Sequence, residues 1–169
     1  MLKKSLAAFI VVLGLLATGC ALRTVALMPD YPVPTDADDL MATASAVIVG
    51  EVRSSSVAMA GENGAGWAET HATVLVQRVV KGDISAGQSV DVAEMGGQYR
   101  LTNYTTPTGI LLKKGRTYLL FLNEGDGATR YLIMEPSSSA YPFDSTGQLT
   151  IEPMNQWVTL DDVKQVTGL

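Results

Sequence analysis

The chain has 169 residues, with 12 lysines and arginines against 17 aspartates and glutamates, and a formal net charge of −5 at pH 7. Proteins that bind nucleic acid owe much of their affinity to an excess of basic side chains, so this balance argues against a nucleic-acid partner. Cys20 is the only cysteine, which excludes an intramolecular disulfide.

The N-terminal segment has the layout of an export signal. Lys3 and Lys4 precede a mostly apolar, uncharged run over residues 6–17. As a helix, that run would span roughly 18 Å, well short of the roughly 30 Å of a bilayer's hydrocarbon core. We therefore interpret residues 1–19 as a cleaved signal peptide rather than a transmembrane helix.

The end of this signal, Ala17-Thr18-Gly19-Cys20, resembles the lipobox of bacterial lipoproteins. The resemblance implies that Cys20 receives a diacylglycerol and that the signal is cut before it. It also implies export, with lipid anchoring to the bacterial cell membrane or the outer membrane. Acyl chains such as palmitate would be the membrane contact, because each buried methylene contributes roughly 0.8 kcal/mol. An ordinary cleaved signal is the alternative.

The mature chain divides into a tether and one domain. Residues 20–35 contain three prolines and few periodic apolar positions, which predicts an extended lipidated tether. Residues 36–169 have the length of a single domain. A short helix is expected near each end of that domain, where acidic residues at 36–39 and Thr159-Leu160-Asp161-Asp162 offer caps and favourable charges for a helix start.

Between these helices the sequence is rich in strand signals. About seven short apolar or alternating segments are separated by glycine-rich turns, at residues 46–52, 67–81, 90–92, 117–122, 131–134, 141–143 and 149–151. Gly50 within the first segment predicts a bend or a close backbone approach. The spacing predicts a mainly β fold: an OB-like antiparallel β-barrel or sandwich with short flanking helices, an open β-sandwich being the alternative.

The second segment carries a more specific prediction. Val74 and Val76 share a strand face, but Arg78 would follow them onto that face if the alternation were unbroken. Burying an unpaired guanidinium is costly, so one inserted residue is expected at Gln77-Arg78. Such a β-bulge returns Val79 to the face of the two valines.

Three segments together resemble a known pattern. A strand at 46–52, a strand ending in Val79-Val80-Lys81-Gly82, and the run Gly115-Arg116-Thr117-Tyr118-Leu119-Leu120-Phe121-Leu122 occur in that order. This order is similar to the OB-type barrel of the netrin and tissue-inhibitor-of-metalloproteinase family, over residues 44–135. The disulfide cysteines of the animal members have no counterpart here, so the resemblance implies the fold and not protease inhibition.

One segment stands out as a candidate binding loop. Residues 96–109 combine Tyr99, Arg100, Asn103 and Tyr104 with several threonines in a polar stretch. Long loops in compact domains are often functional, and tyrosine and arginine suit recognition. The expected partner is a protein or small-molecule ligand of unknown identity.

The sequence predicts no catalytic residue, metal site or cofactor. His71 is the only histidine, which disfavours a zinc site, and no nucleophile elbow or phosphate-binding loop is present. We therefore expect a cell-envelope lipoprotein that presents a small non-enzymatic binding barrel. The alternative is an envelope hydrolase whose carboxylates, for example Glu51, Glu69 and Glu94, meet in a cleft.

Overall fold

The computed structural model describes residues 23–27, 34–61, 66–107, 109, 112–125, 130–133, 139–150 and 158–169. The predicted signal peptide, Cys20 and most of the predicted tether lie outside these ranges. Within them, no helix is long and apolar enough to cross a bilayer.

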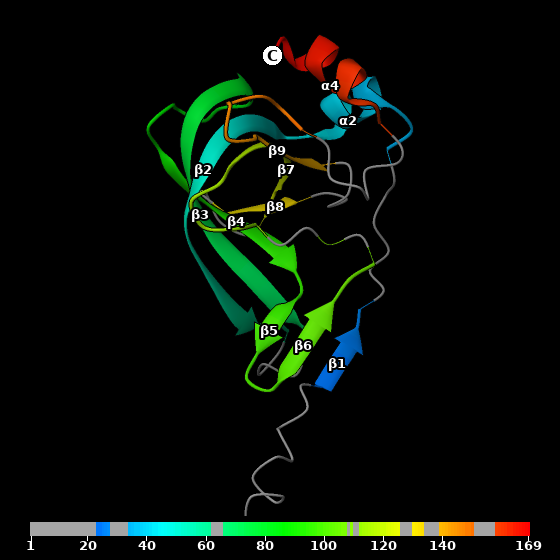
Figure 1. The fold of residues 1–169 in the computed structure, drawn as a ribbon, viewed down its shortest axis with the longest axis vertical. Coiled ribbons are helices and arrows are strands. Elements are labelled where there is room, and N and C mark those ends of the chain that lie inside the picture. The colour runs from blue at the N-terminus through cyan, green and yellow to red at the C-terminus, as the bar shows by residue number, and fades with distance from the viewer. Residues whose placement is uncertain are drawn as a thin grey trace, which may run out of the picture.

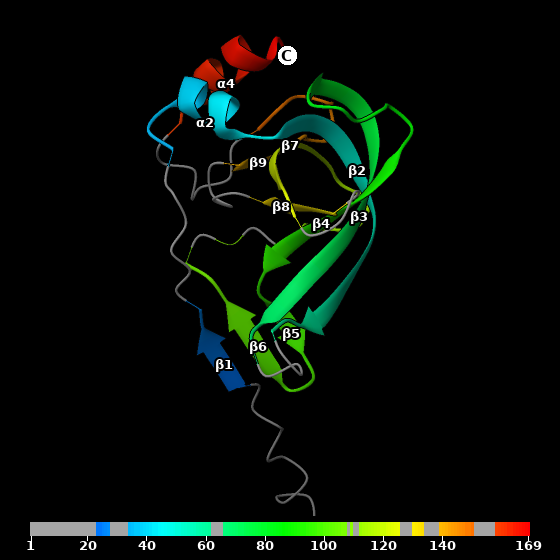
Figure 2. The ribbon, with the colours of Figure 1, turned by 180° about the vertical axis from the view of Figure 1, so that it is seen from behind.

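Five strands close into a barrel (Figures 1 and 2). They are β2 (Ala46–Met59), β3 (Ala68–Lys81), β4 (Ser89–Met95), β7 (Thr117–Glu124) and β8 (Arg130–Ile133). Their order is β2-β3-β4-β8-β7, and pairing of β7 with β2 closes the ring. The closure confirms the OB-like barrel over the open sandwich. The barrel is mixed, because β4 and β8 pair in parallel while the other pairs are antiparallel.

The barrel interior is filled by apolar side chains from all five strands. Gly50 lies where two strands approach closely, and a Cβ there would stand 2.4 Å from Val74 Cγ1 and 3.2 Å from the Leu75 carbonyl oxygen. The predicted close approach is therefore confirmed. The largest interior side chains with almost no exposed surface are Tyr118, Ile48, Leu120 and Leu122.

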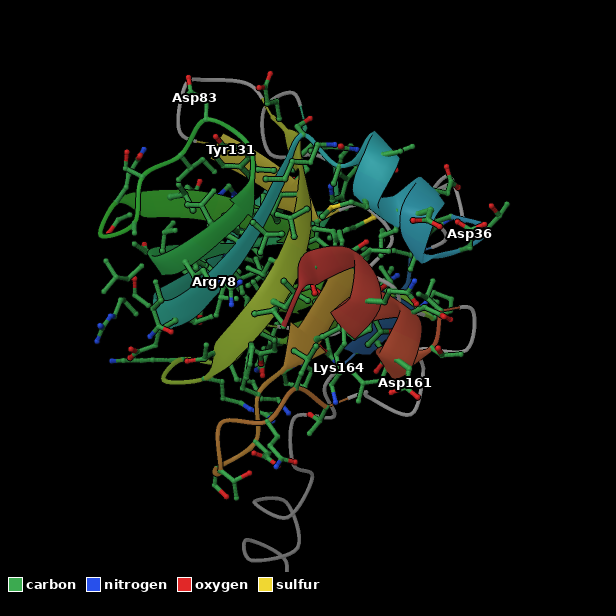
Figure 3. The ribbon with its side chains drawn as sticks, turned by 90° about the horizontal axis from the view of Figure 1, so that it is seen from above. Asp36, Arg78, Asp83, Tyr131, Asp161 and Lys164 are labelled. Atoms are coloured by element: carbon green, nitrogen blue, oxygen red, sulfur yellow. The ribbon has the colours of Figure 1, made fainter. Side chains whose placement is uncertain are left out.

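A second apolar cluster covers the outside of the barrel along β2 and β7. It joins their outward residues to helices α2 (Ala37–Thr43) and α4 (Leu160–Thr167) and to strand β9 (Ala140–Pro142), which pairs with β7. Seen from the helical end, α2 and α4 lie side by side on one flank of the barrel, with Asp161 and Lys164 on α4 (Figure 3). Both helices begin as predicted: Asp36 and Thr159 accept hydrogen bonds from the backbone N–H groups of Asp39 and Asp162.

The predicted bulge is also present. Val49 pairs with Arg78 and Gly50 pairs with Val76, so Gln77 has no partner on β2. Val79 accordingly packs against the same interior cluster as Val74 and Val76, and Arg78 is exposed. The inserted residue keeps the Arg78 guanidinium out of the barrel interior, where burying an unpaired charge would be costly.

Two segments outside the predicted strands are strands in the structure: residues 54–59, where the composition predicts a loop or a splayed hairpin tip, and part of the predicted loop 96–109. Residues 54–59 extend β2 and pair with 68–73 of β3, which lengthens that hairpin beyond the barrel. Within 96–109, β5 (Gly97–Tyr99) and β6 (Thr102–Thr105) form a tight hairpin, and β1 (Arg23–Ala26) pairs in parallel with β6. Neither segment has the apolar alternation that marks a strand in sequence. Each forms a strand because its backbone pairs with a neighbouring segment.

The three-stranded sheet β1-β6-β5 lies at the opposite end of the molecule from the helices (Figures 1 and 2). β5 contacts the extended β2–β3 hairpin. Gly97 makes this contact close, because a Cβ there would stand 2.6 Å from Thr70 Oγ1 and 2.9 Å from Val57 Cγ2.

A groove on the open face of the barrel

The outer face of the barrel along β3 and β8 carries a groove. Its volume is about 740 Å³, and it is open to solvent. Residues beside the β2–β3 turn line one part of it, and residues beside the β7–β8 turn line another. The described lining residues are Ala60, Gly61, Trp67, Glu69, His71, Glu124, Gly125 and Leu132.

Strand alternation and register place the groove residues. Glu69 and His71 are two apart on β3, and the residue between them, Thr70, is buried and donates its hydroxyl to the Gly96 carbonyl oxygen at 2.7 Å. Ala93 of β4 pairs with His71 on one side and with Leu132 on the other. Paired residues project to the same side of a sheet. The short Ala93 side chain on β4 therefore lies between the longer side chains of His71 on β3 and Leu132 on β8.

His71 is held between two carboxylates. Its Nε2 lies 2.9 Å from Glu69 Oε1, and its Nδ1 lies 3.1 Å from Asp91 Oδ2. A neutral imidazole has one N–H, so the ring donates to both carboxylates at once only as the imidazolium. The cluster presents a fixed row of oxygen acceptors at the groove, with the Glu69 side chain 12% exposed and that of Asp91 40% exposed.

Two apolar side chains complete the groove. Trp67 is 39% exposed and Leu132 is 37% exposed, which makes them two of the most exposed large apolar residues in the described chain. The backbone beside Trp67 is fixed, because its carbonyl oxygen accepts the Ala60 N–H at 2.8 Å. An exposed tryptophan beside carboxylates is an arrangement that combines a flat contact surface with hydrogen-bond acceptors.

Tyr131 directly precedes Leu132 on β8, and its ring packs against the barrel interior. Burial raises the pKa of its phenol above the ordinary value of 10, and the carboxylates of Glu124 and Asp83 raise the pKa further. Tyr131 and Asp83 lie toward the same edge of the barrel in Figure 3. The phenol therefore remains a hydrogen-bond donor throughout the neutral range.

The three carboxylates proposed for a hydrolytic cleft have separate surroundings. Glu51 pairs with Arg53 at 3.0 Å on β2, whereas Glu69 contacts His71 on the outer face of β3. Glu94 is only 3% exposed, and its Oε2 accepts the Leu112 N–H at 3.2 Å. The structure thus brings only Glu69 to the groove. Among the residues that the structure describes, no cluster of histidine, cysteine and acidic side chains could hold a metal ion.

The residues predicted as a binding loop occupy the β5–β6 hairpin. Tyr99 pairs with Thr102, and Arg100 lies in the two-residue turn between them. Tyr99 and Tyr104 share one face of the small sheet, and Asn103 lies on the other. None of the four is a described lining residue of the groove, so they form a separate surface.

A second groove, of about 600 Å³, lies beside the turn that follows β9. Its described lining includes Arg116, Phe143 and Asp144. Asp144 Oδ1 accepts hydrogen bonds from the Thr146 hydroxyl, the Thr146 N–H and the Gln148 N–H at 2.7, 2.8 and 2.9 Å. These bonds, the hydroxyl first, lower the pKa of Asp144 and tie its acceptor to the turn.

Comparison with known proteins assigns no family to the chain. The chain matches no protein-family model and no curated protein. The geometry of the groove is therefore the basis for a functional proposal.

Of the groove residues, sequence reasoning proposed only Glu69, as one carboxylate of a hydrolytic cleft. His71 alone in the sequence reads as an ordinary surface histidine, and Trp67 reads as the start of a strand. The available signal was alternation. Glu69 and His71 alternate with Thr70 and Ala72, which indicates a polar outer face on β3. Nothing local indicates that Leu132, about sixty residues later, lies on the same surface.

Proposed function

We propose that the protein is an exported, lipid-anchored envelope lipoprotein whose barrel binds a ligand without chemical turnover. The groove on β3 and β8 carries this proposal. In OB-like barrels the face of the second and third strands, with the loops after the first and fourth strands, binds oligonucleotides and oligosaccharides. Here the groove occupies the corresponding region, between the β2–β3 and β7–β8 connections.

The charge of the groove favours a saccharide over a nucleic acid. Glu69 and Glu124 line it, and Asp91 contacts the ring of His71 beside it. Carboxylates repel phosphates but accept hydrogen bonds from sugar hydroxyl groups. Trp67 supplies an exposed aromatic surface on which the apolar face of a sugar ring packs.

The lining favours binding over catalysis. The described lining residues include no serine, threonine or cysteine that would serve as a nucleophile. Of the carboxylates considered for a hydrolase, only Glu69 reaches the groove, and it is engaged with His71. The side chains that the structure describes in the barrel interior are apolar.

Calorimetric titration of the intact lipoprotein in detergent with neutral oligosaccharides tests the proposal, using chitotetraose and maltotetraose as probes. We expect one of these to bind and Trp67→Ala to weaken the binding by about 2 kcal/mol or more, as loss of a central aromatic contact does. Leu101→Ala, which truncates an exposed apolar residue outside the groove, is the matched control and should leave the affinity unchanged.

The outcome that contradicts the proposal is the absence of saccharide binding, or binding that Trp67→Ala does not alter. His71→Gln sharpens the result. This variant keeps a polar side chain but cannot donate two opposed hydrogen bonds, so we expect a smaller loss of affinity than for Trp67→Ala.

A further inference from the structure

We infer that the tip of the three-stranded sheet, consisting of Arg23, Arg100 and Leu101, rests on the lipid surface and orients the anchored domain. This inference uses the lipid anchor of the proposed function and adds a contact that the anchor alone does not require. It gives the residues of the β5–β6 hairpin a partner of defined chemistry, an anionic membrane surface.

The position of β1 places the three-stranded sheet close to the lipid anchor. Its first residue, Arg23, donates its N–H to the Leu101 carbonyl oxygen at 3.0 Å, and the strand then runs parallel to β6. The β5–β6 turn therefore lies beside the start of β1. Only two residues separate Arg23 from Cys20. Even a fully extended chain places Arg23 within roughly 11 Å of a lipid-bearing Cys20.

The charge of the three-stranded sheet also favours an anionic membrane surface. Residues 23–27 and 96–107, which contain the whole sheet, include two arginines and no aspartate or glutamate. The mature chain as a whole has ten basic and seventeen acidic residues, so the three-stranded sheet departs in sign from the rest of the chain. An anionic leaflet attracts basic groups near its surface, and its field falls off within roughly 10 Å.

An exposed leucine lies at the tip of the three-stranded sheet. Leu101 is 60% exposed, more than either Trp67 or Leu132. Beside it, Arg100 has a positive φ of 54°, a conformation that favours glycine. The Arg100 guanidinium carbon lies 5.4 Å from the centre of the Tyr99 ring. The turn thus holds an arginine, a leucine and a tyrosine together, a combination typical of membrane interfaces.

The opposite end of the molecule lies far from the bilayer in this orientation. The helices α2 and α4 lie at that end (Figures 1 and 2). The turn after β3 is there too, because Lys81 at the end of β3 donates to the Met41 carbonyl oxygen at the end of α2. Exposed Ala86 in that turn is therefore a suitable reference position.

The test places one environment-sensitive fluorophore at each end of the lipidated protein. Because the thiol of Cys20 is occupied by lipid, Leu101→Cys and Ala86→Cys each supply a single thiol for labelling. The proteins are reconstituted into vesicles of phosphatidylglycerol and phosphatidylethanolamine that contain a headgroup-level nitroxide quencher. We expect blue-shifted, quenched emission at position 101 and unquenched, water-like emission at position 86.

Water-like emission at both positions from vesicle-bound protein would overturn the inference. Flotation of the vesicles separates this outcome from failure of the anchor, since protein that does not float refutes the anchor and the docking together. Adding Arg23→Glu to the Leu101→Cys protein should reduce the quenching at 101 without reducing flotation. Unchanged quenching in that variant would contradict the charge argument.

Discussion

The two flanks of the barrel differ in how far an outward-pointing leucine is buried. Leu119 on β7 and Leu132 on β8 both point away from the barrel interior. Leu119 is fully buried beneath α2, α4 and β9, whereas Leu132 is 37% exposed beside the groove. The covered flank buries its apolar residue, and the open flank leaves its apolar residue exposed to solvent. The difference lies in what packs against each strand and not in the strands themselves.

Truncating these two leucines should give the largest difference between the flanks. Leu119→Ala removes a buried side chain and should cost about 2–5 kcal/mol of unfolding free energy. Leu132→Ala should cost less than about 1 kcal/mol, because exposed side chains contribute little to stability. Denaturant unfolding measures both, and equal costs would show that the open flank is covered in solution.

A smaller loss is expected where the barrel itself is tightest. Gly50→Ala introduces a methyl group against Val74 Cγ1 and should destabilise the protein by about 1–3 kcal/mol. Adding Val74→Ala removes that contact, so the double variant should lose less than the sum of the two single losses. Strictly additive losses would mean that the clash with a methyl group at position 50 comes from the neighbouring backbone and not from the Val74 side chain.

The covered flank also depends on how α4 begins. Thr159→Ala removes the hydroxyl that accepts the Asp162 N–H, and should cost about 0.5–2 kcal/mol. Thr159→Ser keeps the hydroxyl and is the matched control, expected to remain near wild type. If both variants lose the same stability, capping is not the role of this residue.

The smallest expected effect is at the turn beside the second groove. Hydrogen bonds from Thr146 and Gln148 lower the pKa of Asp144 relative to its ordinary value of 3.8. A lowered folded-state pKa gives a stabilisation that is present above about pH 3.8 and is lost as the pH falls through the folded value. Asp144→Ala should therefore be less stable than wild type near pH 7, with the difference shrinking in acid.

Thermal unfolding of both proteins across the acid range checks this expectation. A difference that stays constant from neutral pH into acid would show that the carboxylate's charge is irrelevant to the turn. Direct titration of the Asp144 carboxyl by nuclear magnetic resonance should place its pKa below 3.8.

Much of the architecture follows from sequence because it depends on local rules. The bulge at Gln77 was predictable, since Arg78 could not enter the interior beside Val74 and Val76. The caps at Asp36 and Thr159 were predictable from their side chains and the acids that follow. In each case the residues that cause the bulge or the helix cap lie within a few positions of it in the sequence.

The features that escaped prediction depend on distant segments. The β5–β6 hairpin has no apolar alternation, and its parallel partner β1 lies more than seventy residues earlier in the chain. The groove joins Trp67 and His71 to Leu132, which β4 brings together through Ala93. Which outer face the helices leave open is likewise a property of the packed molecule, so residue pattern alone could not locate the site.

The most direct test of the account maps a bound saccharide onto the two flanks. Backbone amide shifts are recorded by nuclear magnetic resonance while the saccharide that binds in calorimetry is added. We predict that the shifts concentrate on the outer faces of β3 and β8, around Trp67, His71 and Leu132. Shifts concentrated on α2 and α4, or around Arg116 and Asp144 in the second groove, would contradict the assignment of the open face as the binding surface.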